Sequence, residues 1–217
     1  MPNWCKNTML ITGTIDEVEK FIAQVNGEDS AFDFNKIIKM PKSLMVESST
    51  IAEQAYAIYY GNEVAKMKVF YTNDIVELNQ KIKQFEINFP YSKSLADSYH
   101  RNITEFNYTN WHDWCSAVWG TKWNACNPDK GDIVKVAGQN LYQIDYFFET
   151  AWTYPKGIYE EIAKQYPNLV VSIDVDEEGG YFWGNILIKN SQVIESLQQG
   201  TRPGGPYDYS EYEDEEE

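Results

Sequence analysis

The stretch that decides the fold is Cys5-Lys-Asn-Thr-Met-Leu-Ile-Thr-Gly-Thr14, near the start of the chain. Side chains in this stretch alternate between two faces, with Met9 and Ile11 on the same one. Such a period of two predicts a half-buried β-strand, and Gly13 ends it. The chain therefore opens with a strand that can pack one face on a core.

A helix is expected directly after this strand. Thr14 resembles an N-cap, and Asp16 and Glu17 place negative charge in the first turn, where the helix dipole favours it. Apolar residues then recur at helical spacing: Val18, Phe21, Ile22 and Val25. Asn26-Gly27 ends the segment, so the chain begins as a β-turn-α unit.

The middle of the chain predicts a large, mainly helical insertion at about residues 30–130. Apolar periodicity favours helices over Glu47–Met67, Asp74–Phe85 and Trp111–Trp119, the last ended by Gly120. The region is also rich in tyrosine.

Regular α/β character returns in the C-terminal half. The expected elements are a hairpin of Ile133–Val136 and Leu141–Thr150, a helix between Pro155 and Pro167, strands Leu169–Val175 and Tyr181–Ile188, and a short helix over Ser191–Gln199. The order is β-α, insertion, β-β-α-β-β. It predicts an α+β, ferredoxin-like antiparallel sheet with helices on one face. We expect a single domain over 1–200, followed by a disordered acidic tail over 201–217.

Charge limits the possible partners. The chain holds 33 acids and 18 Lys and Arg, a net charge of −15. Duplex DNA binding normally needs excess basic residues, so it is disfavoured. No stretch approaches the roughly 20 apolar residues of a membrane span, and no secretory signal precedes the first strand. We therefore expect a cytoplasmic protein that binds neither membranes nor duplex DNA.

Cofactors and metals are not expected. The cysteines are Cys5, Cys115 and Cys126, none in a CxxC pair, and the chain has two histidines. A structural zinc site needs about four paired ligands and an iron–sulfur cluster four close thiolates. His112 and Cys115 are neighbours on the expected helix but lack a third orienting group, so we predict no enzyme.

The densest aromatic stretch, Tyr108–Ala125, contains four tryptophans. Indoles are large and, when buried, need a hydrogen-bond partner for their N–H. The stretch is therefore either a cluster of buried side chains, which we call a packing knot, or an aromatic recognition surface. As a knot, it fixes the insertion to the sheet. As a pocket, it stacks a planar ligand on aromatic rings and offers hydrogen bonds from Lys122 and Asn124. The candidate ligand-binding residues are Trp119, Lys122, Trp123, Asn124 and Trp152.

Several motifs in one order resemble the YubB ferredoxin-like family. They are Met1-Pro-Asn-Trp-Cys-Lys-Asn7, Phe32-Asp-Phe-Asn-Lys-Ile-Ile38, Trp119-Gly-Thr-Lys-Trp-Asn-Ala125, Thr150-Ala-Trp152 and Glu178-Gly-Gly180. The resemblance covers most of positions 1–190, and the chain is similar to proteins encoded on phages and plasmids. It implies the fold and a mobile-element setting, and it implies no activity.

The function expected is a non-enzymatic phage or mobile-element protein that binds and inhibits a host or defence protein. Acidity favours a partner with a basic surface, and tyrosines among the tail acids resemble a nucleic-acid mimic. The candidate partner-binding residues are Tyr209, Glu211, Tyr212, Glu213 and Asp214.

Two alternatives stay open at this point. One is sequestration of a nucleotide-like small molecule in the tryptophan pocket. The other is single-stranded nucleic-acid binding on aromatics of the sheet face, as in other ferredoxin-like domains. The alternating positions that matter there are Tyr142, Tyr146, Phe148, Tyr181 and Trp183.

Overall fold

The computed structural model describes residues 2–205, which form two compact units. The first unit comprises residues 2–39 and 115–205, and the insertion unit comprises residues 40–114. The insertion is thus narrower than the 30–130 expected. It is also a compact unit in its own right, where the sequence suggested one domain over 1–200.

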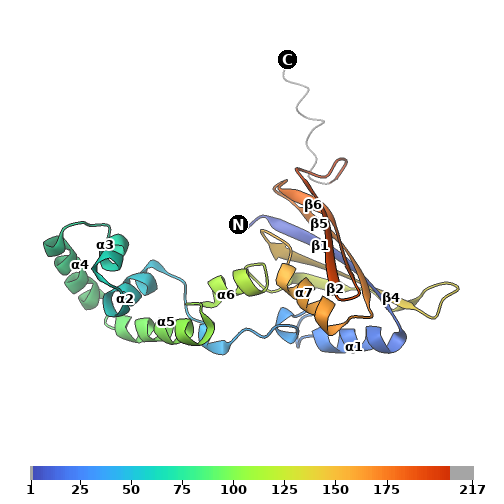
Figure 1. The fold of residues 1–217 in the computed structure, drawn as a ribbon, viewed down its shortest axis with the longest axis horizontal. Helices are drawn as coiled ribbons and strands as arrows, with labels where there is room; N and C mark the ends of the chain where they lie inside the picture. The colour runs from blue at the N-terminus through green and yellow to red at the C-terminus, as the bar shows by residue number, and fades with distance from the viewer. Residues whose placement is uncertain (1, 206–217) are drawn as a thin grey trace, which may run out of the picture. The chain divides into compact units, whose positions relative to one another are not determined.

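The first unit is built on an antiparallel sheet (Figure 1). Its strands are β1 (Trp4–Gly13), β2 (Cys126–Lys130), β3 (Val134–Lys135), β4 (Tyr142–Ala151), β5 (Val170–Glu177), β6 (Phe182–Lys189) and β7 (Gln192–Gln199). The strand order is β2-β4-β1-β5-β6-β7, and β3 also pairs with β4. Because β1 lies between β4 and β5, the sheet follows the ferredoxin-like plan that the sequence predicted.

Two helices of the first unit pack on one face of this sheet (Figure 1). α1 (Ile15–Val25) begins with the expected cap, since Thr14 and Glu17 form a reciprocal capping box. Its Phe21 ring lies 6.1 Å from the ring of Tyr146 on β4. α7 (Lys156–Gln165) connects β4 to β5 and donates the Tyr159 hydroxyl to Asn7 on β1.

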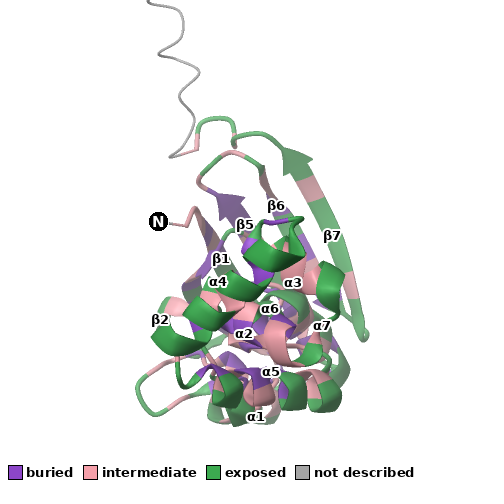
Figure 2. Cartoon of the chain, turned by 90° about the vertical axis from the view of Figure 1, so that its left-hand side faces the viewer, coloured by how far each residue is buried: buried purple, intermediate pink, exposed green. Residues whose placement is uncertain are grey.

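The core of the first unit lies between those helices and the sheet. Figure 2 shows buried residues along the strands and exposed residues on the outer faces of the helices. Aromatic rings dominate it, and Phe32 stacks on Phe148 with centroids 4.9 Å apart. Phe32 precedes the short 3-10 helix η1 (Phe34–Lys36), so the chain leaving α1 closes over the same face.

The insertion unit has a core of its own. Its helices are α2 (Thr50–Tyr60), α3 (Glu63–Phe70), α4 (Ile75–Asn88) and α5 (Ser92–Phe106), preceded by η2 (Lys42–Leu44), and α6 (Trp111–Val118) begins in it. The core residues are Ala55, Phe70, Leu78, Phe85 and Ala96. The single helix expected over Glu47–Met67 is wrong. Gly61 is extended and ends α2, and the Asn62 side chain caps α3.

The short helix expected over Ser191–Gln199 is also wrong, because this segment is β7. Asn190 and Ser191 both have positive φ, at 53° and 60°, and Lys189 pairs with Gln192. A two-residue turn with two left-handed residues is the hairpin geometry that matches strand twist. This turn returns the chain along β6, and cross-strand pairing outweighs the weak helical spacing of Val193, Ile194 and Leu197.

Candidate interaction surface

The sheet has a second face, opposite α1 and α7, which we call the open face. Within the described part of the first unit, no helix covers it (Figure 1). Strand register places the following residues there: Lys6, Thr8, Leu10, Asp145, Phe147, Glu149, Ser172, Asp174, Asp176, Trp183, Asn185, Leu187 and Ile194. Alternation is strict along β1, where Cys5, Asn7 and Met9 face the core.

Apolar side chains are exposed along the open face. Leu10 is 39%, Phe147 38% and Ile194 52% exposed. On β4, Phe147 lies between Asp145 and Glu149, each two residues away and therefore on the same side. Protein-binding surfaces have an apolar centre and a polar rim. Exposed aromatic and aliphatic side chains flanked by charged ones match that composition.

Charges on the open face are arranged in a cross-strand row. Lys6 on β1 lies opposite Glu149 on β4 and opposite Asp176 on β5. Opposite charges across neighbouring strands stabilise the pairing. Asp176 is largely buried, and burial raises the pKa of its carboxyl while the guanidinium of Arg202 lowers it.

Two of the five residues predicted to bind a ligand are engaged inside the fold. Trp119 is 3% exposed and donates its indole N–H to the carbonyl of Ile38 at 2.9 Å. Asn124 accepts from the Phe34 and Ala125 amides and donates to Asp33 Oδ1 at 2.7 Å. Both positions therefore join the loop after α6 to the loop after α1, as a packing knot does.

Lys122 and Trp123 lie elsewhere, at the end of the open face. The Lys122 ammonium sits 4.8 Å from the Trp123 ring centroid, and that ring lies 5.9 Å from Trp4 of β1. Alternation along β1 places Trp4 on the same side as Lys6. Trp152, the fifth predicted residue, is 51% exposed at a positive φ of 70°. The structure does not bring the five residues together around one opening.

The other candidate groups have separate placements. The tail residues Tyr209, Glu211, Tyr212, Glu213 and Asp214 lie outside the described residues. Cys115 is buried, and burial raises the pKa of its thiol to about 12, so it stays protonated at neutral pH. His112 lies 3.2 Å from Asp113 on α6.

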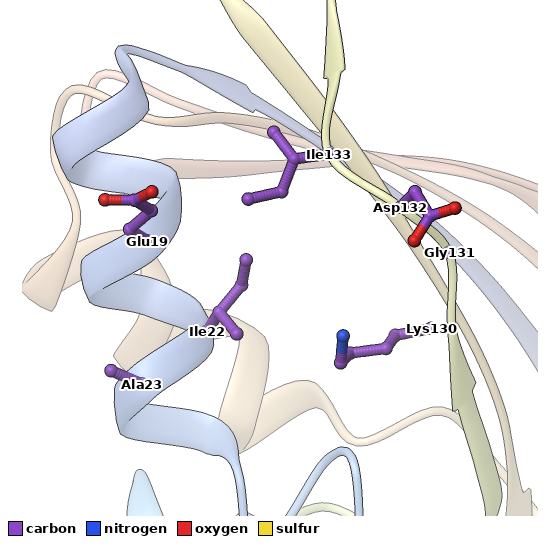
Figure 3. Close-up of a pocket in the computed structure, with 7 residues that line it drawn as sticks. All are labelled: Glu19, Ile22, Ala23, Lys130, Gly131, Asp132 and Ile133. Carbon is purple, nitrogen blue, oxygen red and sulfur yellow. The ribbon is translucent and has the colours of Figure 1, made fainter.

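Each of the two units contains a hollow. One, of about 490 Å³, lies between α1 and the segment after β2, where Ile22 and Ile133 point into the gap beside Lys130 (Figure 3). The charged groups of Glu19, Lys130 and Asp132 do not converge on one point in it (Figure 3). The other, of about 470 Å³, lies within the insertion unit and is lined by Tyr56 and Tyr99.

The cavity in the insertion unit suits an uncharged or cationic molecule better than a nucleotide. Its charged lining groups are the carboxylates of Glu53 and Asp113 and the ammonium of Lys68. Asp113 Oδ2 already accepts from the Thr109 hydroxyl and the Asn110 amide. Two carboxylates against one ammonium oppose the phosphates of a nucleotide.

Strands β4 to β7 and α7 fall within the region that resembles a known family. Residues 129–216 match the family model described as the ferredoxin-like domain in Api92-like protein. This match agrees with the ferredoxin-like strand order described above.

A solved structure gives a weaker likeness. Protein api92 from Yersinia pseudotuberculosis is 12% identical, with a TM-score of 0.43, over 95% of this chain and 100% of that one. A search of curated proteins finds no match. Within residues 2–205, no helix is both long and apolar enough to cross a bilayer.

Of the sheet-face aromatic residues that the sequence predicted, Trp183 lies on the open face, but the prediction missed Phe147. The expected aromatic positions Tyr146 and Phe148 point into the core, and the exposed one between them is Phe147. The signal was present in the alternation Asp145-Tyr-Phe-Phe-Glu149, whose odd positions are acidic and aromatic. Only the position of α1 and α7 determines which of the two faces is open.

Proposed function

We propose that this chain is a non-enzymatic interaction protein whose open face and acidic tail bind a basic surface of a host or defence protein. The observation that carries the proposal is the uncovered sheet face, with Phe147 exposed between Asp145 and Glu149. Apolar contact supplies affinity there, and the flanking carboxylates select a basic partner and speed association.

The tail extends the same chemistry. Between Asp208 and Glu217 it carries seven acids and no base, and the rest of the chain keeps a net charge of −8 of the total −15. We place the protein in the bacterial cytoplasm and, on the sequence motifs, within the YubB ferredoxin-like family, where it acts as a counter-defence inhibitor. A basic nucleic-acid groove of the partner suits such charge, because acids can occupy the positions of phosphates.

The two alternatives receive less support. A surface that binds single-stranded nucleic acid stacks bases on aromatic rings in a positively charged groove. Phe147 instead has a carboxylate two residues away on each side. A nucleotide pocket around the tryptophans needs Trp119 and Asn124 available, and both are engaged within the fold.

The test is affinity capture from bacterial lysate with the full chain and two charge-reversal variants. Asp145→Lys changes the open face, and the matched control Glu160→Lys changes an exposed site on α7. We expect wild type and Glu160→Lys to recover the same basic protein, and Asp145→Lys to bind it at least about tenfold more weakly. A chain ending at Pro206 should also bind more weakly. Equal binding by both charge-reversal variants would exclude the open face as the partner-binding surface.

A further inference from the structure

Arg202 folds back over the open face after β7. Its Nη2 donates to Asp174 Oδ1 at 2.6 Å and to the carbonyl of Val175 at 3.2 Å. Its Nε lies 3.5 Å from Asp176 Oδ2. One guanidinium therefore meets two carboxylates that are two residues apart on β5.

An aromatic ring also contacts the Arg202 guanidinium. Trp183 on β6 is the register partner of Asp176, and the Arg202 guanidinium carbon lies 5.2 Å from the Trp183 ring centroid. A planar guanidinium satisfies carboxylates through directed N–H groups and stacks on an indole face, whereas a lysine ammonium does neither as well. The combination therefore favours arginine over lysine.

We propose that Asp174, Asp176 and Trp183 form an arginine-binding site for the partner, and that Arg202 is the chain's own plug in that site. The proposal rests on the interaction function above and names the chemistry recognised: an arginine-bearing protein segment. Binding exchanges the partner's arginine for Arg202, and no covalent change is involved.

The segment that carries Arg202 suits exchange. It follows the last strand, between Gly200 and Gly204, which both have positive φ, at 87° and 67°. Its release leaves the pairing of β5 with β6 and of β6 with β7 unchanged, because Arg202 takes part in neither ladder. The contact is partly exposed, with 28% of the Arg202 side chain accessible, so water screens its charge.

Position along the chain connects the plug to the tail. Asp208, the first acid of the tail, follows Arg202 by six positions, so the chain between them can span at most about 22 Å. An arginine-rich segment that enters the site is then held next to a second acidic element. Such linkage raises the effective concentration of the second contact.

The proposal makes a prediction that a structural staple does not share. If Arg202 is a plug, its removal frees the site, and Arg202→Ala binds arginine more tightly than the parent. The apparent dissociation constant of a blocked site rises with the fraction of molecules that are blocked. If Arg202 only staples the chain end, its removal leaves arginine binding unchanged or weaker.

The experiment uses the full-length chain with the seven tail acids replaced by their amides, so that only the open face is measured. The probes are the peptides (Arg-Gly)₅ and (Lys-Gly)₅, titrated by calorimetry. We expect Arg202→Ala to bind the arginine peptide about tenfold more tightly than the parent, with less than about threefold change for the lysine peptide. Adding Asp174→Asn and Asp176→Asn should abolish the gain.

Folding is controlled by Arg202→Gln, which keeps a similar length, and by the thermal unfolding midpoint of each variant. An unchanged or weaker affinity of the folded Arg202 variants for the arginine peptide would overturn the plug. An equal gain for both peptides would overturn arginine specificity. Loss of the lysate partner by the natural chain on charge reversal tests the interaction function separately, since that assay leaves Arg202 and the tail intact.

Discussion

Tyr159 of α7 donates its hydroxyl to Asn7 Oδ1 of β1 at 2.7 Å, and both side chains are completely buried. The Asn7 amide in turn donates to the carbonyl of Cys5 at 2.9 Å and to the Thr150 hydroxyl at 3.0 Å. The helix that connects β4 to β5 is thus fixed to the central strand by a satisfied polar network inside an apolar core.

Removing one member of this network should cost more than its bond alone. We expect Tyr159→Phe to lower the free energy of unfolding by about 1–3 kcal/mol, because it leaves Asn7 Oδ1 buried without its donor. The matched control is Tyr142→Phe on β4, whose ring is partly exposed and lies under the Lys135 ammonium. Urea unfolding compares the two, and an equal, small loss in both would show that the Tyr159 hydroxyl adds nothing.

Alkaline pH should destabilise the fold through Cys5. Burial raises the pKa of its thiol from 9.0 to about 12, with the Glu177 carboxylate adding to the rise and the Thr150 hydrogen bond opposing it. The unfolded thiol ionises first. The stability is therefore fully present below pH 9 and is lost as pH rises from about 9 towards 12, by about 1.4 kcal/mol per unit.

Cys5→Ala isolates this contribution. The difference in unfolding free energy between wild type and Cys5→Ala should shrink by about 1 kcal/mol between pH 8 and pH 10 in reducing buffer. Cys126→Ala is the control, because that thiol is partly exposed and less desolvated. A difference for Cys5→Ala that does not change with pH would contradict the raised pKa.

The turn between β6 and β7 allows a stabilising substitution. Ser191 has a φ of 60°, which glycine adopts without the strain of a Cβ. We expect Ser191→Gly to raise the midpoint of thermal unfolding, with about 0.5–1 kcal/mol of added stability. The same change at Ser196, in the middle of β7, should destabilise by a similar amount. The opposite sign pattern would mean that residues 191–199 do not pair with β6.

Much of the fold could be predicted from the sequence where local signals agree with the final structure. The Thr14–Glu17 cap and the alternation after Cys5 identify β1 and α1 because both depend on neighbouring residues. The hairpin of β5 and β6 was likewise readable from Glu177-Glu-Gly-Gly180. These elements are confirmed by the structure.

The rest depends on contacts between distant residues. β2 and β7 are edge strands with weak apolar patterns, and each forms by pairing with a strand already in the sheet. Arg202 fell within the expected disordered tail of residues 201–217, yet it contacts Asp174, 28 positions away. Periodicity also cannot tell which sheet face is open, since Phe147 and Phe148 are adjacent, equally apolar residues on opposite faces.

A substitution at Asn124 tests whether this residue binds a ligand or holds the fold together. Its amide donates to Asp33 Oδ1, which also accepts from the Asn35 amide nitrogens. In Asn124→Asp the donor is lost and a second carboxylate faces Asp33. We expect a loss of about 2–3 kcal/mol at pH 7, because two like charges meet in a partly buried site.

That loss should depend on pH in a defined direction. Like charge raises the folded pKa of the new carboxyl above its unfolded value of about 3.9. The variant therefore recovers stability as pH falls and loses it as pH rises through the window between those two pKa values. Asn127→Asp, exposed on β2 and hydrogen-bonded to Glu149, is the matched control and should lose less, since solvent screens its charge. Urea unfolding at pH 4.5 and 7 measures both. Equal behaviour of the two variants would leave Asn124 free for a ligand, whereas the expected difference makes it a structural bridge.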